Sequence, residues 1–138
     1  MKNPTFKDIE WLAKKLRSKT GCPWDRKQTI SSMMENLSEE AEEVTQAIKN
    51  KDHINLKEEL GDLLFQIVMI AQIAKENRQF DIKGVLKGID KKIRSRHTWV
   101  FGKEKAKTAE EAISMWLKNK EKEKQKKAKR KPVKKVKK

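Results

Sequence analysis

The sequence predicts an all-α protein with one folded domain and a basic C-terminal tail. Its 138 residues include only 5 glycines and 3 prolines, too few for the many turns of an all-β protein of this length. Hydrophobic residues, 36% of the chain, recur at helical spacing in five segments. No apolar run reaches the roughly 20 residues that cross a bilayer, and the N-terminus lacks a signal-peptide core. We therefore expect a cytoplasmic protein with no membrane partner. The single cysteine, Cys22, allows no internal disulfide and no Cys-based metal site.

The first helix is expected over about 6–19, where Thr5 and Asp8 have the spacing of an N-terminal cap. Its apolar face consists of Ile9, Leu12, Ala13 and Leu16. Gly21 and Pro23 then break the helical pattern, so a loop is expected over 24–31.

The second helix is expected over about 32–50. Ser32 and Glu35 form a capping box at its start. Its apolar stripe consists of Leu37, Ala41, Val44 and Ile48.

The third helix, expected to begin at Asp52 or Ile54 and to end near Asn77, is apolar nearly all round. Its main stripe contains Leu56, Leu60, Leu63, Leu64, Ile67, Ala71 and Ala74. Phe65 and Met69 lie away from that stripe, and a helix that is apolar on several sides is buried on several sides. Because one thin bundle cannot cover all these sides, we expect a homodimer, or a dimer of dimers, with this helix in the interface.

The fourth helix is expected to follow Asp81, which has the position of a helix cap, and Gly102 ends the segment after it. Its apolar positions are Ile82, Val85, Leu86, Ile89 and Ile93. The fifth helix begins at a capping box of Thr108 and Glu111. Its apolar positions are Ala109, Ala112, Ile113, Trp116 and Leu117.

Two acidic pairs border the apolar faces of the second and third helices. Glu40 with Glu43, and Glu59 with Asp62, each have i and i+3 spacing. Carboxylates gathered beside a core raise one another's pKa, and a divalent cation removes that penalty. Ligation by oxygen alone suits Mg²⁺ or Mn²⁺. The alternative is ordinary solvated charge in a chain that is 40% charged.

A basic cluster lies at the end of the fourth helix, where Lys92 and Arg96 are i and i+4 on one face. These side chains could hold phosphate oxygens, although a solvated basic face is the alternative. Cations beside a carboxylate-held metal are what a triphosphate substrate requires, because the metal activates water and the cations neutralise the leaving group. The chain has no Gly-x4-Gly-Lys phosphate loop, so the chemistry is expected to centre on the metal.

The charge of the chain is concentrated in its last residues. Residues 118–138 contain thirteen Lys or Arg and two Glu, a net charge of +11 out of the +15 of the whole chain. Residues 118–127 could extend the fifth helix, and the rest is expected to be disordered because it cannot bury enough apolar surface. The tail is either a solubilising segment or a nonspecific anchor for nucleic acid.

Five blocks of the sequence resemble those of MazG-type nucleoside triphosphate pyrophosphohydrolases. Residues 37–44 and 56–64 resemble the family signature, Glu-Glu-x-x-Glu followed by Glu-x-x-Asp. Residues 21–29 resemble the N-terminal block, 96–102 the Arg-His-Pro-His-Val-Phe-Gly block and 110–116 the closing block that ends in Trp. Thr98 and Trp99 stand where the family usually has Pro and His, which changes the local loop.

The resemblance implies a helical bundle of the all-α NTP pyrophosphohydrolase type over residues 1–121, followed by the Lys-rich tail at 122–138. It implies that Mg²⁺, with Mn²⁺ as the alternative ion, is bound by Glu40, Glu43, Glu59 and Asp62. It also implies that the nucleotide is contacted by Asn36, Lys92, Arg96 and Trp116.

The expected function is Mg²⁺-dependent hydrolysis of a ribo- or deoxynucleoside triphosphate between its α and β phosphates, as nucleotide-pool housekeeping. The products are the monophosphate and pyrophosphate. Glu39 is the candidate general base for the attacking water. The alternative is a non-catalytic helical module that binds nucleic acid through its basic tail, and the four carboxylates argue against it because such a module has no need of them.

Overall fold

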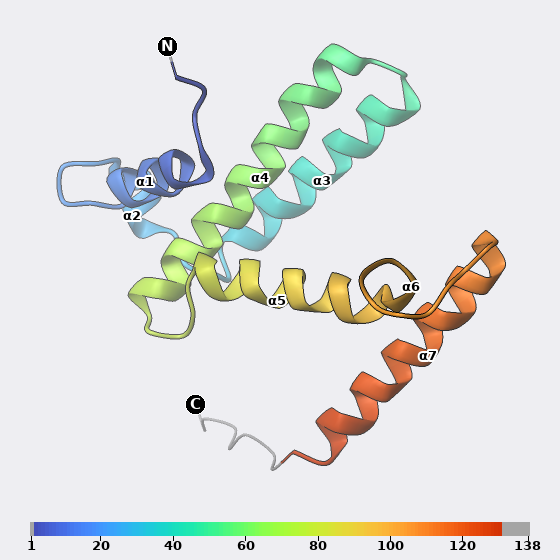
Figure 1. Cartoon of the computed structure of the whole chain (residues 1–138). Coiled ribbons are helices and arrows are strands. Elements are labelled where there is room, and N and C mark those ends of the chain that lie inside the picture. The colour runs from blue at the N-terminus through green and yellow to red at the C-terminus, as the bar shows by residue number, and fades with distance from the viewer. Residues whose placement is uncertain (1, 131–138) are drawn as a thin grey trace. The chain divides into compact units, whose positions relative to one another are not determined.

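The computed structural model describes residues 2–130, and all regular secondary structure in that range is α-helical (Figure 1). The helices are α1 (Phe6–Leu16), α2 (Pro23–Lys27), α3 (Met33–Lys49), α4 (His53–Glu76), α5 (Ile82–Arg96), α6 (Thr98–Phe101) and α7 (Ala109–Ala128). The all-α fold class predicted from the sequence is confirmed. The chain forms two compact units, Met1–Val85 and Leu86–Lys138. Among the described residues, no helix combines the length and the apolar character needed to span a membrane.

The core of the first unit lies where α1 packs against the antiparallel pair of α3 and α4, which run side by side in Figure 1. Its buried side chains are Ala13, Met33, Val68, Met69 and Ile73. The partly buried side chains packed around them are Ile9, Leu16, Ile30, Phe65 and Ile70. Burial of these apolar surfaces fixes α3 against α4, and this pair carries the acidic residues discussed below.

The core of the chain buries one of the two apolar faces of α4. Met69 is only 2% exposed, whereas Leu60 is 49% and Leu64 is 39% exposed. Of the expected main stripe, only the C-terminal Ala71 and Ala74 are fully buried. The helical wheel identified two apolar faces, but which of them is covered depends on where α1 packs. Within the chain, the core therefore covers the Met69 side of α4 and leaves Leu60 and Leu64 exposed.

The connection between α1 and α3 contains a helix that the sequence analysis missed. A loop was expected over 24–31, but α2 begins at Pro23 and ends at Lys27. Proline at the first helical position suits a short helix because it has no N–H to leave unpaired. Before α2, the backbone of Gly21 lies close to the C-terminal end of α1. A Cβ at this position would overlap the carbonyl oxygens of Lys15 and Leu16.

The caps expected at helix starts are confirmed in part. Asp8 accepts hydrogen bonds from Thr5, at 2.7 Å from its backbone nitrogen and 3.0 Å from Oγ1. Asp81 Oδ1 accepts from the backbone nitrogen of Gly84 at 3.0 Å. The capping box of Ser32 and Glu35 is wrong, because the Ser32 hydroxyl instead accepts from the backbone nitrogen of Thr29, in the turn before α3.

At α7, Thr108 Oγ1 accepts from the backbone nitrogen of Glu111 at 3.2 Å, as expected for a cap. The Glu111 carboxylate accepts from the backbone nitrogen of Lys107 rather than from that of Thr108, so only half of the capping box forms.

The second unit is held together by a polar seam between α5 and α7. Asn119, which is 8% exposed, donates from Nδ2 to the Arg96 carbonyl at 3.1 Å and to Thr98 Oγ1 at 3.0 Å. Thr98 begins α6, a short helix that was not expected. Helix α7 continues to Ala128, past the domain boundary expected at residue 121. Residues 131–138 of the expected tail lie outside the described residues.

Candidate metal centre

The structure brings the two predicted acidic pairs together. Glu40 and Glu43 come from α3, and Glu59 and Asp62 come from α4. A tight connection at 50–52, with Lys51 at a φ of 53°, reverses the chain so that the two pairs face each other. One carboxylate oxygen from each residue can be chosen so that all four lie within 4.8 Å of one another.

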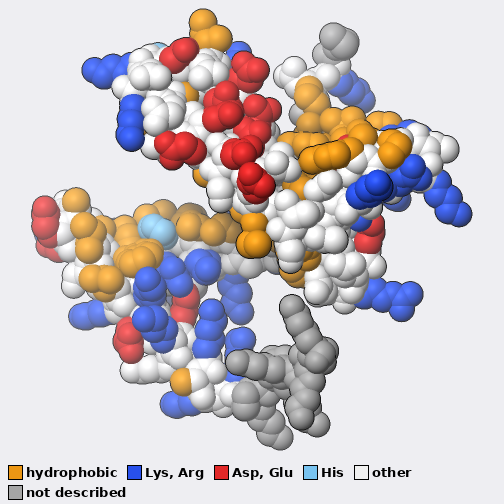
Figure 2. Space-filling model, turned by 180° about the vertical axis from the view of Figure 1, so that it is seen from behind, with side chains coloured by type: hydrophobic (Ala, Val, Ile, Leu, Met, Phe, Trp, Pro, Cys, Tyr) orange, Lys and Arg blue, Asp and Glu red, His pale blue; other side chains and the backbone are white. Residues whose placement is uncertain are grey.

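Burial of this cluster is uneven. Glu40 and Glu59 are half-buried, and Oε2 of each is buried without a hydrogen-bond partner among the described residues. Glu43 and Asp62 are exposed. Figure 2 shows acidic side chains gathered on one face of the α3–α4 pair. Buried carboxylate oxygens without partners are costly, so their presence indicates a site that a cation can complete.

The carboxylates also perturb one another's protonation. Burial raises the pKa of Glu40, and the negative charges of Glu43 and Asp62 raise it further. A hydrogen bond with the Glu43 carboxyl group raises the pKa of Glu59 from 4.5 to about 7, with burial and the neighbouring charges adding to it. The donors are all carboxylate oxygens, which fits Mg²⁺ or Mn²⁺.

Two further candidates lie next to this cluster on α3. Glu39 is exposed, and its charge is among those that raise the pKa of Glu40. Asn36 is half-buried and lies four residues before Glu40, and therefore on the same side of α3.

The remaining predicted site residues, Lys92, Arg96 and Trp116, belong to the second unit. The guanidinium of Arg96 donates to Glu123 Oε2, from Nε at 3.2 Å and from Nη2 at 3.0 Å. It also lies over the Trp116 ring, 5.3 Å from the ring centre. The structure thus brings Arg96 and Trp116 together, and it adds Glu123 as an ion-pair partner that the sequence analysis missed.

A second residue missed from the sequence is Gln66 on α4. Its Oε1 atom is buried without a hydrogen-bond partner in the described part of the chain. Gln66 follows Glu59 by seven residues and Asp62 by four, so it lies on the same face of the helix. That spacing was the signal that could have identified it.

Known proteins have similar sequences, and a known family matches the part of the chain that carries the four clustered carboxylates. Residues 28–101 match the MazG nucleotide pyrophosphohydrolase domain, and this range contains all four clustered carboxylates. A nucleoside triphosphate pyrophosphohydrolase/pyrophosphatase MazG from Thermotoga maritima is 45% identical over 97 residues, which are 70% of this chain and 38% of that protein. A nucleoside triphosphate pyrophosphohydrolase from Escherichia coli K12 is 41% identical over 96 residues, 70% of this chain and 36% of that protein. The chain therefore spans little more than a third of the length of these two relatives.

The fold has a counterpart among solved structures. A crystal structure of a mazG-related protein from Thermotoga maritima superposes with a TM-score of 0.68 at 34% sequence identity. The match covers 82% of this chain and 96% of that one. The sequence match and the structural match agree, and this chain belongs to the MazG nucleotide pyrophosphohydrolase family.

Proposed function

We propose that this chain hydrolyses ribo- or deoxynucleoside triphosphates between the α and β phosphates in a Mg²⁺-dependent reaction. The products are the nucleoside monophosphate and pyrophosphate, and the role is housekeeping of the nucleotide pool. The observation that carries the proposal is the cluster of four carboxylates with two buried, unpartnered oxygens. Relatives named nucleoside triphosphate pyrophosphohydrolases support the same activity.

In this proposal Glu40, Glu43, Glu59 and Asp62 hold the ion, which is Mg²⁺ or Mn²⁺. When bound, the ion supplies Lewis-acid chemistry that withdraws charge from the phosphate oxygens and makes water more acidic. A carboxylate that is not fully used by the metal can serve as base, and Glu39 beside the cluster is the candidate. The water oxygen joins the α-phosphorus, the bond to the bridging oxygen breaks, and pyrophosphate leaves while Glu39 takes the proton.

Nucleotide binding is assigned to Asn36, Lys92, Arg96 and Trp116. The ammonium of Lys92 offsets phosphate charge. The indole of Trp116 offers a face against which a base can stack. Glu123 engages Nε and Nη2 of Arg96, so it competes with a nucleotide phosphate for these two donors.

The test is a pyrophosphate-release assay over a panel of nucleoside triphosphates. Glu59→Gln and Asp62→Asn should abolish release, because each removes a negatively charged ligand. Glu58→Gln is the matched control, since Glu58 is the exposed neighbour of Glu59 on α4 and lies outside the cluster. Near-normal release by Glu59→Gln, or an equal loss in Glu58→Gln, contradicts the assignment.

We also propose that the chain forms a homodimer, or a dimer of dimers, through α4. The support is the exposed apolar stripe of this helix, where Leu60 is 49%, Leu64 39% and Ile67 40% exposed. Soluble monomers rarely expose a continuous apolar stripe of this kind. Light scattering should give at least twice the chain mass, and Leu64→Glu should lower it. A stable monomer at micromolar concentration overturns this proposal.

A further inference from the structure

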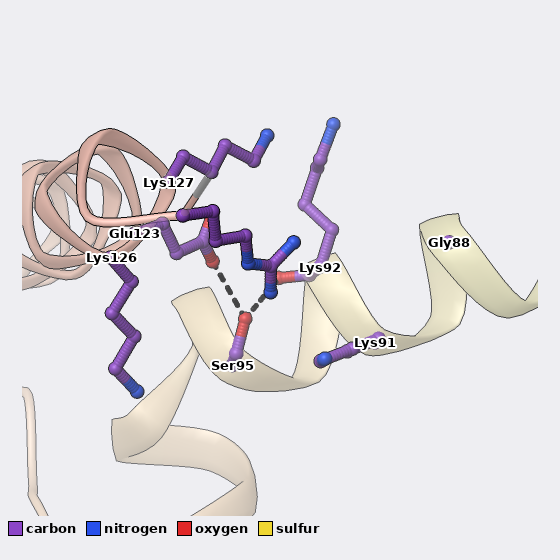
Figure 3. A pocket seen from close by; sticks show the side chains of 8 residues that line it. Gly88, Lys91, Lys92, Ser95, Glu123, Lys126 and Lys127 are labelled. Atoms are coloured by element: carbon purple, nitrogen blue, oxygen red, sulfur yellow. Dashed lines mark hydrogen bonds between the residues drawn. The ribbon is translucent and has the colours of Figure 1, made fainter. Parts of the chain in front are cut away.

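The second unit contains a basic pocket in which the proposed reaction assigns a role in nucleotide binding only to Lys92. It has a volume of about 480 Å³ and lies between α5 and α7 (Figure 3). Helix α5 lines one side with Lys91, Lys92 and Ser95, and α7 lines the other with Lys126 and Lys127. Arg130, which follows the end of α7, completes the basic lining. We call the five cationic side chains of this lining the α5–α7 basic surface.

The charge of this surface is not balanced within the described part of the chain. Among the described residues that line the pocket, Glu123 is the one acidic residue, and it is already engaged by Arg96 and Ser95. These contacts, the Ser95 hydroxyl first, hold the pKa of Glu123 below its usual range, so it stays ionised and paired. None of the five cations forms a salt bridge within residues 2–130. Five positive charges therefore face solvent around one pocket.

The polar seam joins the two helices that carry four of these five cations. Ser95 Oγ donates to Glu123 Oε1 at 2.8 Å, and Asn119 joins the end of α5 to α7. A partner therefore meets lysines on two helices that hydrogen bonds join, so their relative placement need not be ordered on binding.

The chemistry of the lining favours phosphate groups spread along a chain. Lysine ammonium groups bind phosphate as point charges, with no demand on base identity. Within residues 2–130 no aromatic side chain lines the pocket, so the lining offers no ring for base stacking. The sequence continues with five more lysines between 131 and 138, more cationic charge than one small phosphate compound can use. These features fit an extended polyanion.

We propose that the α5–α7 basic surface binds the sugar-phosphate backbone of nucleic acid without sequence preference. The proposal is independent of the metal centre, whose carboxylates belong to the first unit. Such binding depends on the release of counterions and weakens steeply with salt.

The experiment measures fluorescence anisotropy of labelled single-stranded oligonucleotides of two unrelated sequences, titrated with the full chain between about 50 and 200 mM salt. The test variant is Lys126→Gln/Lys127→Gln/Arg130→Gln. The matched control is Lys2→Gln/Lys7→Gln/Lys14→Gln, which removes the same charge from exposed positions of the first unit.

The test variant should weaken binding about tenfold or more at the middle of the salt range, and its plot of log affinity against log salt should be shallower by about 2 to 3. The control variant should bind about as well as the unmodified chain. Both oligonucleotides should bind equally. Circular dichroism should show unchanged helicity, and hydrolysis of free nucleotides should stay near the level of the unmodified chain because none of the three residues is assigned to the nucleotide site.

Equal weakening by both variants overturns the proposal, because net charge alone would then explain binding. Unchanged binding by the test variant also overturns it and assigns the contact to residues 131–138. Two competitors complete the test. Displacement of the oligonucleotide by polyglutamate as effectively as by unlabelled DNA would mean that the surface binds acidic polymers in general. Displacement by inorganic triphosphate at equal phosphate concentration would mean that it is a site for small phosphate compounds.

Discussion

Arg17 is the residue whose removal should affect the first unit most clearly. It directly follows α1, and its side chain is 9% exposed. Its guanidinium donates to the Glu76 carboxylate, from Nε at 2.8 Å and from Nη2 at 3.0 Å. Nη1 donates to the backbone carbonyls of Asp25 and Gln28. One side chain therefore ties α1 to α2, to the turn before α3 and to the end of α4.

The cost of replacing Arg17 by Met follows from these four hydrogen bonds. Each of the two part-buried carbonyls loses its donor, at about 1 kcal/mol each. The carboxylate of Glu76 loses a bidentate partner, but its side chain is 38% exposed and can rehydrate. The loss of this ion pair should therefore cost about 1 kcal/mol. The total is about 3 kcal/mol, which corresponds to a Tm lower by about 10 °C in a chain of this size.

The assay is urea and thermal unfolding followed by circular dichroism, at one fixed protein concentration because association would add to stability. The control is Arg26→Met, since within the described range the side chain of Arg26 makes a single, exposed hydrogen bond, to the Lys19 carbonyl at 3.0 Å. It should cost less than about 0.5 kcal/mol. A loss below about 1 kcal/mol for Arg17→Met, or a loss equal to that of the control, refutes the reasoning.

Three further predictions concern the metal centre and the backbone. Millimolar Mg²⁺ should raise the Tm of the unmodified chain and leave that of Glu59→Gln unchanged, as differential scanning calorimetry can measure; an equal rise in both contradicts the site. Without metal, the folded chain binds more protons than the unfolded chain between pH 4.5 and about 7, because the pKa of Glu59 is raised. The free energy of unfolding should therefore fall as the pH rises through that window, and Glu59→Gln should weaken this dependence on pH. A free energy of unfolding that rises with pH contradicts the raised pKa of Glu59. Gly21→Ala should lower the free energy of unfolding by about 2 kcal/mol or more, because the new Cβ overlaps two backbone carbonyls. Gly61→Ala should raise it by up to about 1 kcal/mol, because a Cβ there meets nothing within 4 Å and alanine favours the helix. Equal effects of the two substitutions in urea unfolding would contradict this.

The acidic centre could be predicted from the sequence because its signal is local. Glu40 and Glu43 lie one turn apart on one helix, as Glu59 and Asp62 do on the next, and a short connection can only make such helices antiparallel neighbours. The raised pKa values of Glu40 and Glu59 follow once the helices pack. The partnerless Oε1 of Gln66, in contrast, depends on which neighbours surround it.

The sequence by itself determined that the chain is helical, and it determined most of the caps and the four carboxylates, because periodicity and capping depend on residues at most four positions apart. Only the tertiary structure decided which apolar face of α4 is covered, since α1 packs on the side of Met69 and leaves Leu64 exposed. The partner of Arg96 was also decided at that level, because Glu123 lies 27 residues away in the sequence. Such contacts depend on how helices pack in space, and a helical wheel carries no information about that.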